Sequence, residues 1–297
     1  MLTAALAAVT GCSTGPAPRP GSATSQARQE VAALAVLTDD ATSLRQHWQL
    51  FGAQQLLVQR CMRQLGLRYL VTRTGPEPAA GITTADTRGT AVPASYAITG
   101  PPVGAIDGVP AQDRYVGSLP PAARARYLVA YNGSATRMAT LTLPSGTVSR
   151  YLTGGCEGRA RTELYGSVRA AMQDTLVPQD VNAMFHASLA TNRRYQSALV
   201  TWQRCMARSG WRAKTPAAAI QALQAQAAAS ASTAALAGKQ HSEAAADQRC
   251  DTAGDLRGTL TALRRAFLDR QPKETLIRLN QIEQTRRSAL ARARTAP

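Results

Sequence analysis

The chain has 297 residues, a formal net charge of +16 and five cysteines. This length can bury one large hydrophobic core or two smaller ones. Aromatic residues make up only 5% of the chain and no nucleic-acid-binding motif occurs, so no nucleic acid partner is expected despite the positive charge. The charge fits either a well-solvated surface or an anionic partner, and the sequence leaves both open.

The N-terminus carries an apolar run that ends in a cysteine. Residues 2–8 are mostly Leu and Ala, and Val9-Thr10-Gly11-Cys12 follows. An apolar stretch closed by small residues is typical of a signal-peptide processing site. Because Val9-Thr10-Gly11-Cys12 also resembles the lipobox of bacterial lipoproteins, we predict that residues 1–11 are the remnant of a signal peptide. Cys12 would then be the lipidated first residue of the mature protein.

One feature departs from an ordinary signal peptide. No charged residue precedes Arg19, whereas a signal peptide opens with Lys or Arg. Either Met1 is an internal start, with the charged segment upstream, or the N-terminus is ordinary and its cysteine is there by chance. We expect the first.

The next segment is a predicted tether. Residues 13–26 are rich in Ser, Thr, Gly, Ala and Pro, so residues 12–29 are expected to be a lipidated cysteine followed by a flexible linker. Two acyl chains on one cysteine give durable membrane anchoring. The predicted location is therefore the outer face of the cell membrane, with the rest of the chain exported.

Four further cysteines predict disulfide bonds. An even number of cysteines in an exported chain favours disulfides, and Cys61, Cys156, Cys205 and Cys250 are the candidates. No Cys-x-x-Cys pair is present, which argues against a thioredoxin-like site or a zinc ribbon. The three histidines lack metal-ligand spacing, so no metal or cofactor site is predicted.

A short repeat suggests how the cysteines pair. Gln59-Arg60-Cys61-Met62 recurs as Gln203-Arg204-Cys205-Met206, and a glycine follows each copy at the same distance. Each half then contains a second cysteine with an acidic neighbour. We infer two related units, residues 30–176 and 177–297, and predict the bridges Cys61–Cys156 and Cys205–Cys250 among the three possible connectivities.

The first half predicts helices around one hairpin. Apolar residues at helical spacing predict a helix over residues 40–65, and Pro120-Pro121 begins another over residues 122–131. Residues 69–119 are rich in Gly, Pro and Thr and read as a long loop with at most short strands. Alternating residues on both sides of Pro144-Ser145-Gly146 predict a β-hairpin.

The remaining chain predicts long helices. Apolar stripes run over residues 156–172, 181–206 and 242–267, an alanine-rich helix covers residues 217–237, and a last helix follows Pro272. We place the join between the two units at residues 177–180. The predicted fold is thus mainly α, with two disulfide-bonded helical units, a small hairpin and a long Gly/Pro-rich loop.

Several segments together carry a family resemblance. They are Gln59–Met62 with Gly66, Tyr127–Gly133, Gly154–Glu157, Leu164–Gly166, Trp202–Met206 with Gly210, and Ala244–Cys250. Together they are similar to segments of a group of actinobacterial secreted lipoproteins of uncharacterised function. The resemblance implies a mainly helical, lipid-anchored envelope protein with paired cysteines, and it carries over no catalytic residue.

The expected function is binding or structural rather than enzymatic. No Gly-x-Ser-x-Gly or His-Glu-x-x-His motif occurs, and the acidic residues are scattered. Residues 256–297 hold ten cations against three acids, so these helices are a candidate surface for an anionic lipid or wall polymer. An envelope protein is another possible partner. The alternatives are a cell-envelope hydrolase without a recognisable motif and a transporter-associated solute-binding lipoprotein.

Overall fold

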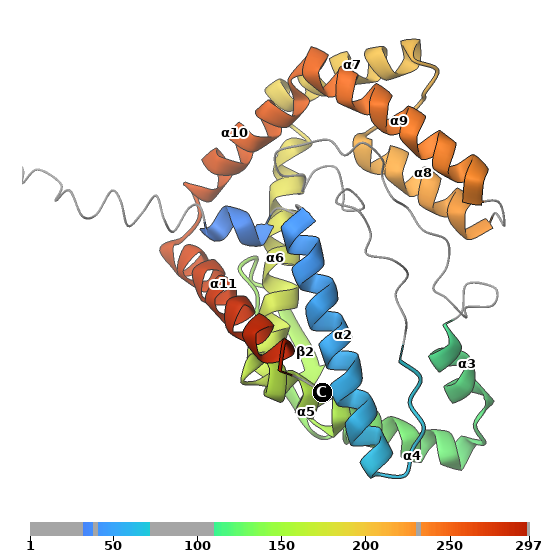
Figure 1. Ribbon diagram of the computed structural model, residues 1–297. Coiled ribbons are helices and arrows are strands. Elements are labelled where there is room, and N and C mark those ends of the chain that lie inside the picture. Colours follow the sequence, from blue (N-terminus) through green and yellow to red (C-terminus); the bar gives the residue numbers. More distant parts are fainter. Residues whose placement is uncertain (1–31, 38–40, 72–109, 230–232, 296–297) are drawn as a thin grey trace, which may run out of the picture.

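The computed structural model describes residues 32–37, 41–71, 110–229 and 233–295. These residues are mainly helical and contain one two-stranded antiparallel hairpin, which confirms the predicted fold class (Figure 1). Cys12, the predicted tether and residues 72–109 of the predicted loop lie outside the described residues. None of the described helices combines the length and the apolar character needed to cross a bilayer.

The first half of the chain forms the lower part of the molecule in Figure 1. Residues 32–37 form a short helix at its start. The elements that follow are α2 (Ala41–Gln64), α3 (Ala111–Ser118), α4 (Pro121–Asn132), β1 (Met138–Thr142), β2 (Val148–Leu152) and α5 (Gly155–Tyr165).

The second half begins with a helix that runs upward between the two parts of the molecule and ends with one that returns to the lower part (Figure 1). Its elements are α6 (Val168–Leu189), α7 (Arg193–Arg208), α8 (Pro216–Ala229), α9 (Thr233–Gly254), α10 (Leu256–Leu268) and α11 (Lys273–Ala293).

Several predicted helices are interrupted by single capping residues. The stripe over residues 156–172 is two helices, because Gly166 ends α5 with a φ of 84° and the Ser167 hydroxyl accepts the Ala170 N–H at 3.0 Å to begin α6. The stripe over residues 181–206 is likewise divided. There Asn192 accepts the Tyr195 N–H at 3.0 Å and starts α7.

Two further stretches of chain differ from the helices expected. The helix expected over residues 242–267 changes direction at Asp255, which has a φ of 45° and separates α9 from α10. The boundary expected at residues 177–180 lies inside α6, which passes through the buried Pro178 without ending. A proline removes one N–H from the helical ladder but does not always end a helix that tertiary packing supports.

The predicted loop over residues 69–119 contains a helix. Its end, α3, is a two-turn segment that begins after Pro110. The Gln112 side chain of α3 accepts the Leu70 N–H at 2.8 Å and donates to the Tyr127 hydroxyl at 2.6 Å. The prediction of an unstructured loop was therefore wrong here, because tertiary contacts stabilise a segment that is too short to show a periodic pattern.

The hairpin forms where it was predicted. Strands β1 and β2 pair with Thr142 opposite Val148, and the Leu143 N–H donates to the Thr147 carbonyl at 2.8 Å. Gly146, with a φ of 88°, supplies the left-handed conformation of the turn. The hairpin buries Leu141 and Tyr151 against Val168 of α6.

Both predicted disulfides are present. Cys61–Cys156 joins α2 to α5 with the two Cα atoms 5.5 Å apart, and Cys205–Cys250 joins α7 to α9 with a Cα separation of 5.4 Å. Each bond therefore ties the end of a Cys-Met helix to the helix that carries the second cysteine of the same half.

The sequence repeat corresponds to a repeated helix ending. After α2, Gly66 has a φ of 70° and the Leu67 N–H donates to the Met62 carbonyl at 2.9 Å. After α7, Gly210 has a φ of 84° and the Trp211 N–H donates to the Met206 carbonyl, also at 2.9 Å. This pattern is a glycine C-cap, and each methionine is completely buried.

The repeated glutamine has the same role in both copies. Gln59 Nε2 donates to the Tyr69 carbonyl at 3.1 Å, and Gln203 Nε2 donates to the Lys214 carbonyl at 2.6 Å. Each glutamine side chain binds a backbone carbonyl of the segment that follows its helix. The repeat is thus a local device that turns the chain beside a disulfide.

The core has two main parts that one helix connects. One surrounds Trp202 and Phe185 on α6, α7, α9 and α10, and the other surrounds Met62 and Cys156 on α2, α4 and α5. Helix α11 belongs to both. Its Leu279 and Ile282 lie in the first core, whereas Ala289 and Leu290 lie in the second. Packing thus crosses between the sequence halves at the C-terminus.

Removal of either disulfide should lower stability strongly. In the chain-entropy treatment, loops of 95 and 45 residues correspond to roughly 4.7 and roughly 4.0 kcal/mol. The paired variants Cys61→Ala/Cys156→Ala and Cys205→Ala/Cys250→Ala should each lose a few kcal/mol of unfolding free energy in denaturant. The reduced native protein, with both bonds open, should lose more than either variant. A loss below about 1 kcal/mol in both variants would contradict this view of the fold.

A buried carboxyl group makes stability depend on pH. Glu243 of α9 is 5% exposed, and burial raises its pKa from 4.5 to about 7, with Asp247 adding to the rise and Lys239 opposing it. Between these two pH values the folded state binds more protons than the unfolded state, so stability falls as pH rises.

Glu243→Gln should remove this dependence. The native protein should be about 1–3 kcal/mol less stable at pH 8 than at pH 5 on account of this group, and the variant should lose that part of the difference in urea unfolding. Glu274→Gln, at an exposed site, is the matched control and should keep it. If the stability of Glu243→Gln depended on pH as that of the native protein does, Glu243 would not be the group responsible.

Candidate functional site

The predicted site residues that the structure describes are all structural. Cys61, Cys156, Cys205 and Cys250 are disulfide-bonded, so none of them is available as a nucleophile or a metal ligand. Among the described residues, no group of three or more His, Cys, Asp or Glu is placed to hold a metal ion. The predicted lipidation site, Cys12, lies outside this part of the chain.

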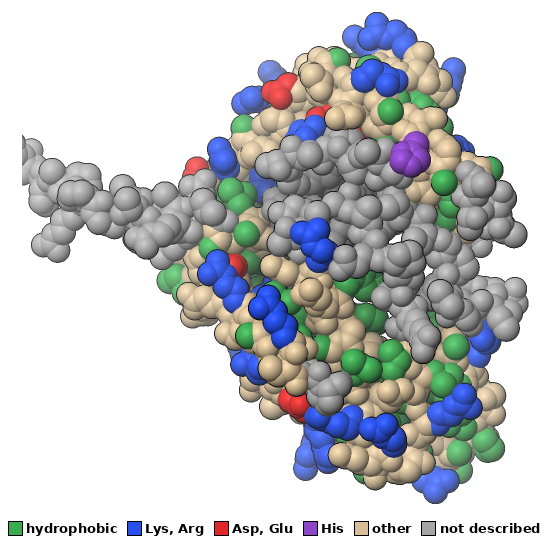
Figure 2. Space-filling model, in the orientation of Figure 1, with side chains coloured by type: hydrophobic (Ala, Val, Ile, Leu, Met, Phe, Trp, Pro, Cys, Tyr) green, Lys and Arg blue, Asp and Glu red, His purple; other side chains and the backbone are tan. Residues whose placement is uncertain are grey.

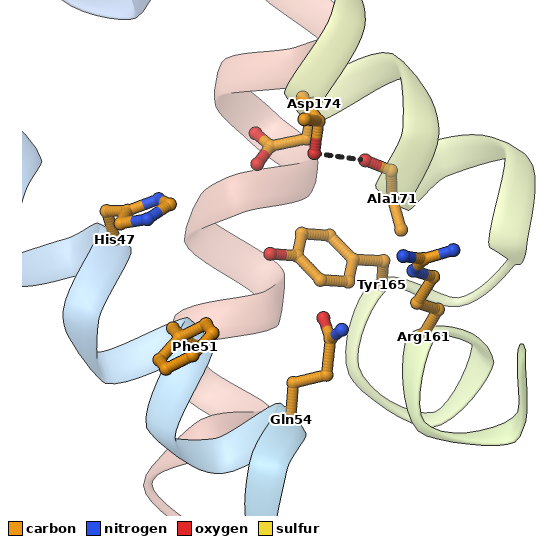
Figure 3. A pocket seen from close by; sticks show the side chains of 8 residues that line it. His47, Phe51, Gln54, Arg161, Tyr165, Ala171 and Asp174 are labelled. Atoms are coloured by element: carbon orange, nitrogen blue, oxygen red, sulfur yellow. Dashed lines mark hydrogen bonds between the residues drawn. The ribbon is translucent and has the colours of Figure 1, made fainter. Parts of the chain in front are cut away.

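The strongest candidate site is a polar cavity between α2, α5 and α6. Its volume is about 160 Å³. Figure 3 shows side chains from α2 on one side and from α5 and α6 on the other, with α11 behind them. The lining residues are His47, Phe51, Gln54, Arg161, Tyr165, Ala171, Asp174 and Thr175.

Asp174 forms the acidic wall of the cavity and is held by α11. Arg286 Nε donates to Asp174 Oδ1 at 2.9 Å, and both side chains are mostly buried. Burial raises the pKa of the Asp174 carboxyl group, while Arg286 and the more distant His47 oppose the rise. The pair therefore ties α11 to α6 across a separation of 112 residues.

Glu157, the residue next to Cys156, positions the basic wall of the cavity. Glu157 follows Cys156, and its Oε1 accepts from Gln54 Nε2 at 2.9 Å. Arg161, one helical turn further along α5, contacts the same oxygen at 2.7 Å. The disulfide, Glu157, Gln54 and Arg161 thus form one connected set, which leaves Gln54 and Arg161 with defined positions in the cavity wall.

Neutral tyrosines complete the polar environment. The Tyr165 side chain points into the cavity (Figure 3), and burial together with the charge of Asp174 raises the pKa of its hydroxyl. Near Glu157, Tyr69 stacks on Tyr131 with ring centroids 5.9 Å apart, and burial raises the pKa of Tyr69 to about 12. Burial and the nearby Glu157 carboxylate also raise the pKa of Tyr131.

The arrangement is suited to hydrogen bonding with a small polar molecule. Tyr165, Gln54 and Arg161 offer donors, and Asp174 and Gln54 offer acceptors, around a volume comparable to cavities that hold a single ring. The cavity hydroxyl of Thr175 donates to the Ala171 carbonyl at 3.2 Å, the contact drawn in Figure 3. That hydroxyl is therefore oriented toward the backbone of α6.

Sequence reasoning did not find this cavity. Gln54 and Glu157 lie 103 residues apart, and Asp174 and Arg286 lie 112 apart. No short motif joins them. The one usable signal was the acidic residue beside Cys156, which the predicted disulfide would have placed against α2.

The basic C-terminal segment is mostly engaged within the protein. Arg286 binds Asp174, Arg278 Nη1 donates to the Thr142 carbonyl at 2.9 Å, and Arg292 Nε donates to the Leu164 carbonyl at 2.6 Å. Arg257 pairs with Asp251 and Arg287 with Glu283. The buried Arg264 lies over the Phe185 ring, 4.6 Å from its centroid. Six of the ten cations are thus engaged within the protein.

Comparisons of the chain with protein-family models, with curated proteins and with solved structures found no match. The function proposed below therefore depends on the residues and their geometry.

The Asp174–Arg286 pair should be important for stability. Asp174→Ala leaves a largely buried guanidinium without its carboxylate, which should cost about 1–3 kcal/mol of unfolding free energy. Glu163→Ala is the matched control, because the Arg60–Glu163 pair, at 2.7 Å, is much more exposed. It should cost less than about 1 kcal/mol. Equal losses of unfolding free energy in the two variants, measured by urea unfolding, would show that burial of the Asp174–Arg286 pair adds nothing to its contribution to stability.

Proposed function

We propose that the protein is a lipid-anchored binding module at the outer face of the bacterial cell membrane. Cys12 would carry the lipid, and residues 12–29 would link it to the helical body. The observation that carries the proposal is the pair of disulfides, which close the two Cys-Met helix ends. Such bonds persist in oxidising compartments and are rare in the cytosol.

A binding role is favoured over a catalytic one by the character of the cavity. Its carboxylate, Asp174, is bound to Arg286, and the nearby Glu157 is bound to Gln54 and Arg161. Groups held in this way are well placed to recognise a ligand by fixed hydrogen bonds. A hydrolase would need a nucleophile with a base, or a carboxylate pair free to exchange protons.

The solute-binding alternative gains no support from the fold. Transporter-associated solute-binding lipoproteins are built from alternating strands and helices in two α/β lobes. The described residues instead form helices and a single hairpin. A helical module that presents a small polar cavity and a charged exterior remains the best description.

Membrane anchoring through Cys12 can be tested by fractionation. In the native host, the protein should appear in the membrane fraction with a diacylglyceryl group on Cys12, as found by mass spectrometry. Cys12→Ser should release it, because the lipid is then lost. Ser13→Ala, which leaves the processing site intact, should stay in the membrane fraction.

The redox state of the cysteines gives an independent test. Thiol-reactive labelling of intact cells without reductant should leave the four helix cysteines unlabelled, and labelling after reduction should reach them. Recovery of the protein in the cytosol with reduced thiols would overturn the proposal.

A further inference from the structure

Helix α7 carries an arginine-rich face that the rest of the fold does not use. Its exposed arginines are Arg193, Arg194, Arg204 and Arg208, and the 16-residue helix contains no acidic residue. At about 100° per residue, these four side chains fall within an arc of about 100°. We call these four residues the α7 arginine face.

The opposite side of α7 is buried and rigidly held. Trp202 and Met206 are completely buried, and Trp202 Nε1 donates to Asp247 Oδ1 of α9 at 2.9 Å. The Cys205–Cys250 disulfide fixes the same pair of helices. Because α7 cannot roll on the core, its arginines must face outward. Figure 2 shows Lys and Arg side chains along the upper edge of the molecule, where Figure 1 places α7.

The α7 arginine face differs from the basic C-terminal helices. Within the described residues, none of its four arginines forms an ion pair. Most C-terminal cations, by contrast, bind a carboxylate, a backbone carbonyl or an aromatic ring of the protein itself. Four exposed cations on one rigid helix without carboxylate partners create a local positive potential that favours an anionic partner.

The shape of this face favours a membrane surface. The helix is about 24 Å long, and Val200, 39% exposed, lies at the edge of the arc that the arginines cover. Thr201, Arg204, Ala207 and Arg208 line a wide, open depression. An open array of cations beside one apolar side chain suits phosphate headgroups and the interface beneath them. A linear polyanion is better held in a groove that surrounds it.

We infer that the α7 arginine face docks on anionic phospholipid headgroups. The inference deepens the proposed function and rests on it, because it places the exported body against the membrane that the lipid anchor occupies. Each arginine near an anionic membrane should strengthen binding roughly fivefold. Lipid anchoring and headgroup contact would then fix the orientation of the cavity relative to the bilayer.

The test uses the full chain with Cys12→Ser, so that no acyl group contributes. Binding is measured by co-sedimentation with vesicles of phosphatidylcholine alone and with vesicles that also contain phosphatidylglycerol. We expect binding only to the anionic vesicles, and a linear fall of log affinity with log salt concentration. Equal binding to neutral vesicles would overturn the inference.

A matched pair of variants separates the face from net charge. The first combines Arg193→Gln, Arg194→Gln, Arg204→Gln and Arg208→Gln. The control combines Arg265→Gln, Arg270→Gln, Lys273→Gln and Arg294→Gln. These residues are also exposed, and the control removes the same number of positive charges. The α7 variant should lose at least about tenfold in affinity for anionic vesicles, whereas the control should change less than about threefold.

Other outcomes overturn the inference. An equal loss in both variants would show an effect of net charge alone, and no loss in the α7 variant would show that the face is not used. Binding to an anionic wall polymer without binding to vesicles would show that the surface recognises a polymer. Circular dichroism and intact disulfides establish that each variant is folded. Because the vesicle test needs no anchor, its failure leaves the Cys12 fractionation test unaffected.

Discussion

The structure depends on a covalent constraint that is applied twice. In each half, a disulfide pins the end of a Cys-Met helix to the helix that carries its second cysteine, and a glycine C-cap turns the chain away directly afterwards. The consequences differ between the halves. In the first, the bond places Glu157 where it can hold Gln54 and Arg161 in the cavity wall. In the second, the bond and the hydrogen bond from Trp202 to Asp247 together hold α7 against α9, so that the arginines of α7 face away from the core.

The arginine content has two physical uses. On α10 and α11, several guanidinium groups bind carboxylates, backbone carbonyls or an aromatic face inside the protein. They thereby connect elements that are distant in sequence. On α7, the arginines have no such role within the described residues. Arginine suits both uses because its planar group satisfies several acceptors when buried and remains charged under all conditions when exposed. Net charge alone therefore says little about where an anionic partner binds.

Much of the fold could be predicted from the sequence, and the failures share a cause. The helix from residue 40 to residue 65, the hairpin and both cysteine pairs follow from local periodicity, turn chemistry and the internal repeat. The joints at Ser167, Asn192 and Asp255 were missed because the apolar stripe continues across them, and one capping residue decides the break. The cavity was not predicted for a different reason, because its walls come from residues more than a hundred positions apart in the sequence. The arginines of α7 were visible in the sequence opposite Trp202 and Met206, but only the structure shows that, within the described residues, none of them forms an ion pair.

The placement of α11 has a consequence for how the chain reaches its final form. This last helix contributes Ala289 and Leu290 to the core built around α2 and α5, and Leu279 and Ile282 to the core built around Trp202. Neither core is therefore complete until α11 has been synthesised and has packed against both of them. A nascent chain that emerges with its N-terminus first keeps apolar surface exposed throughout that time.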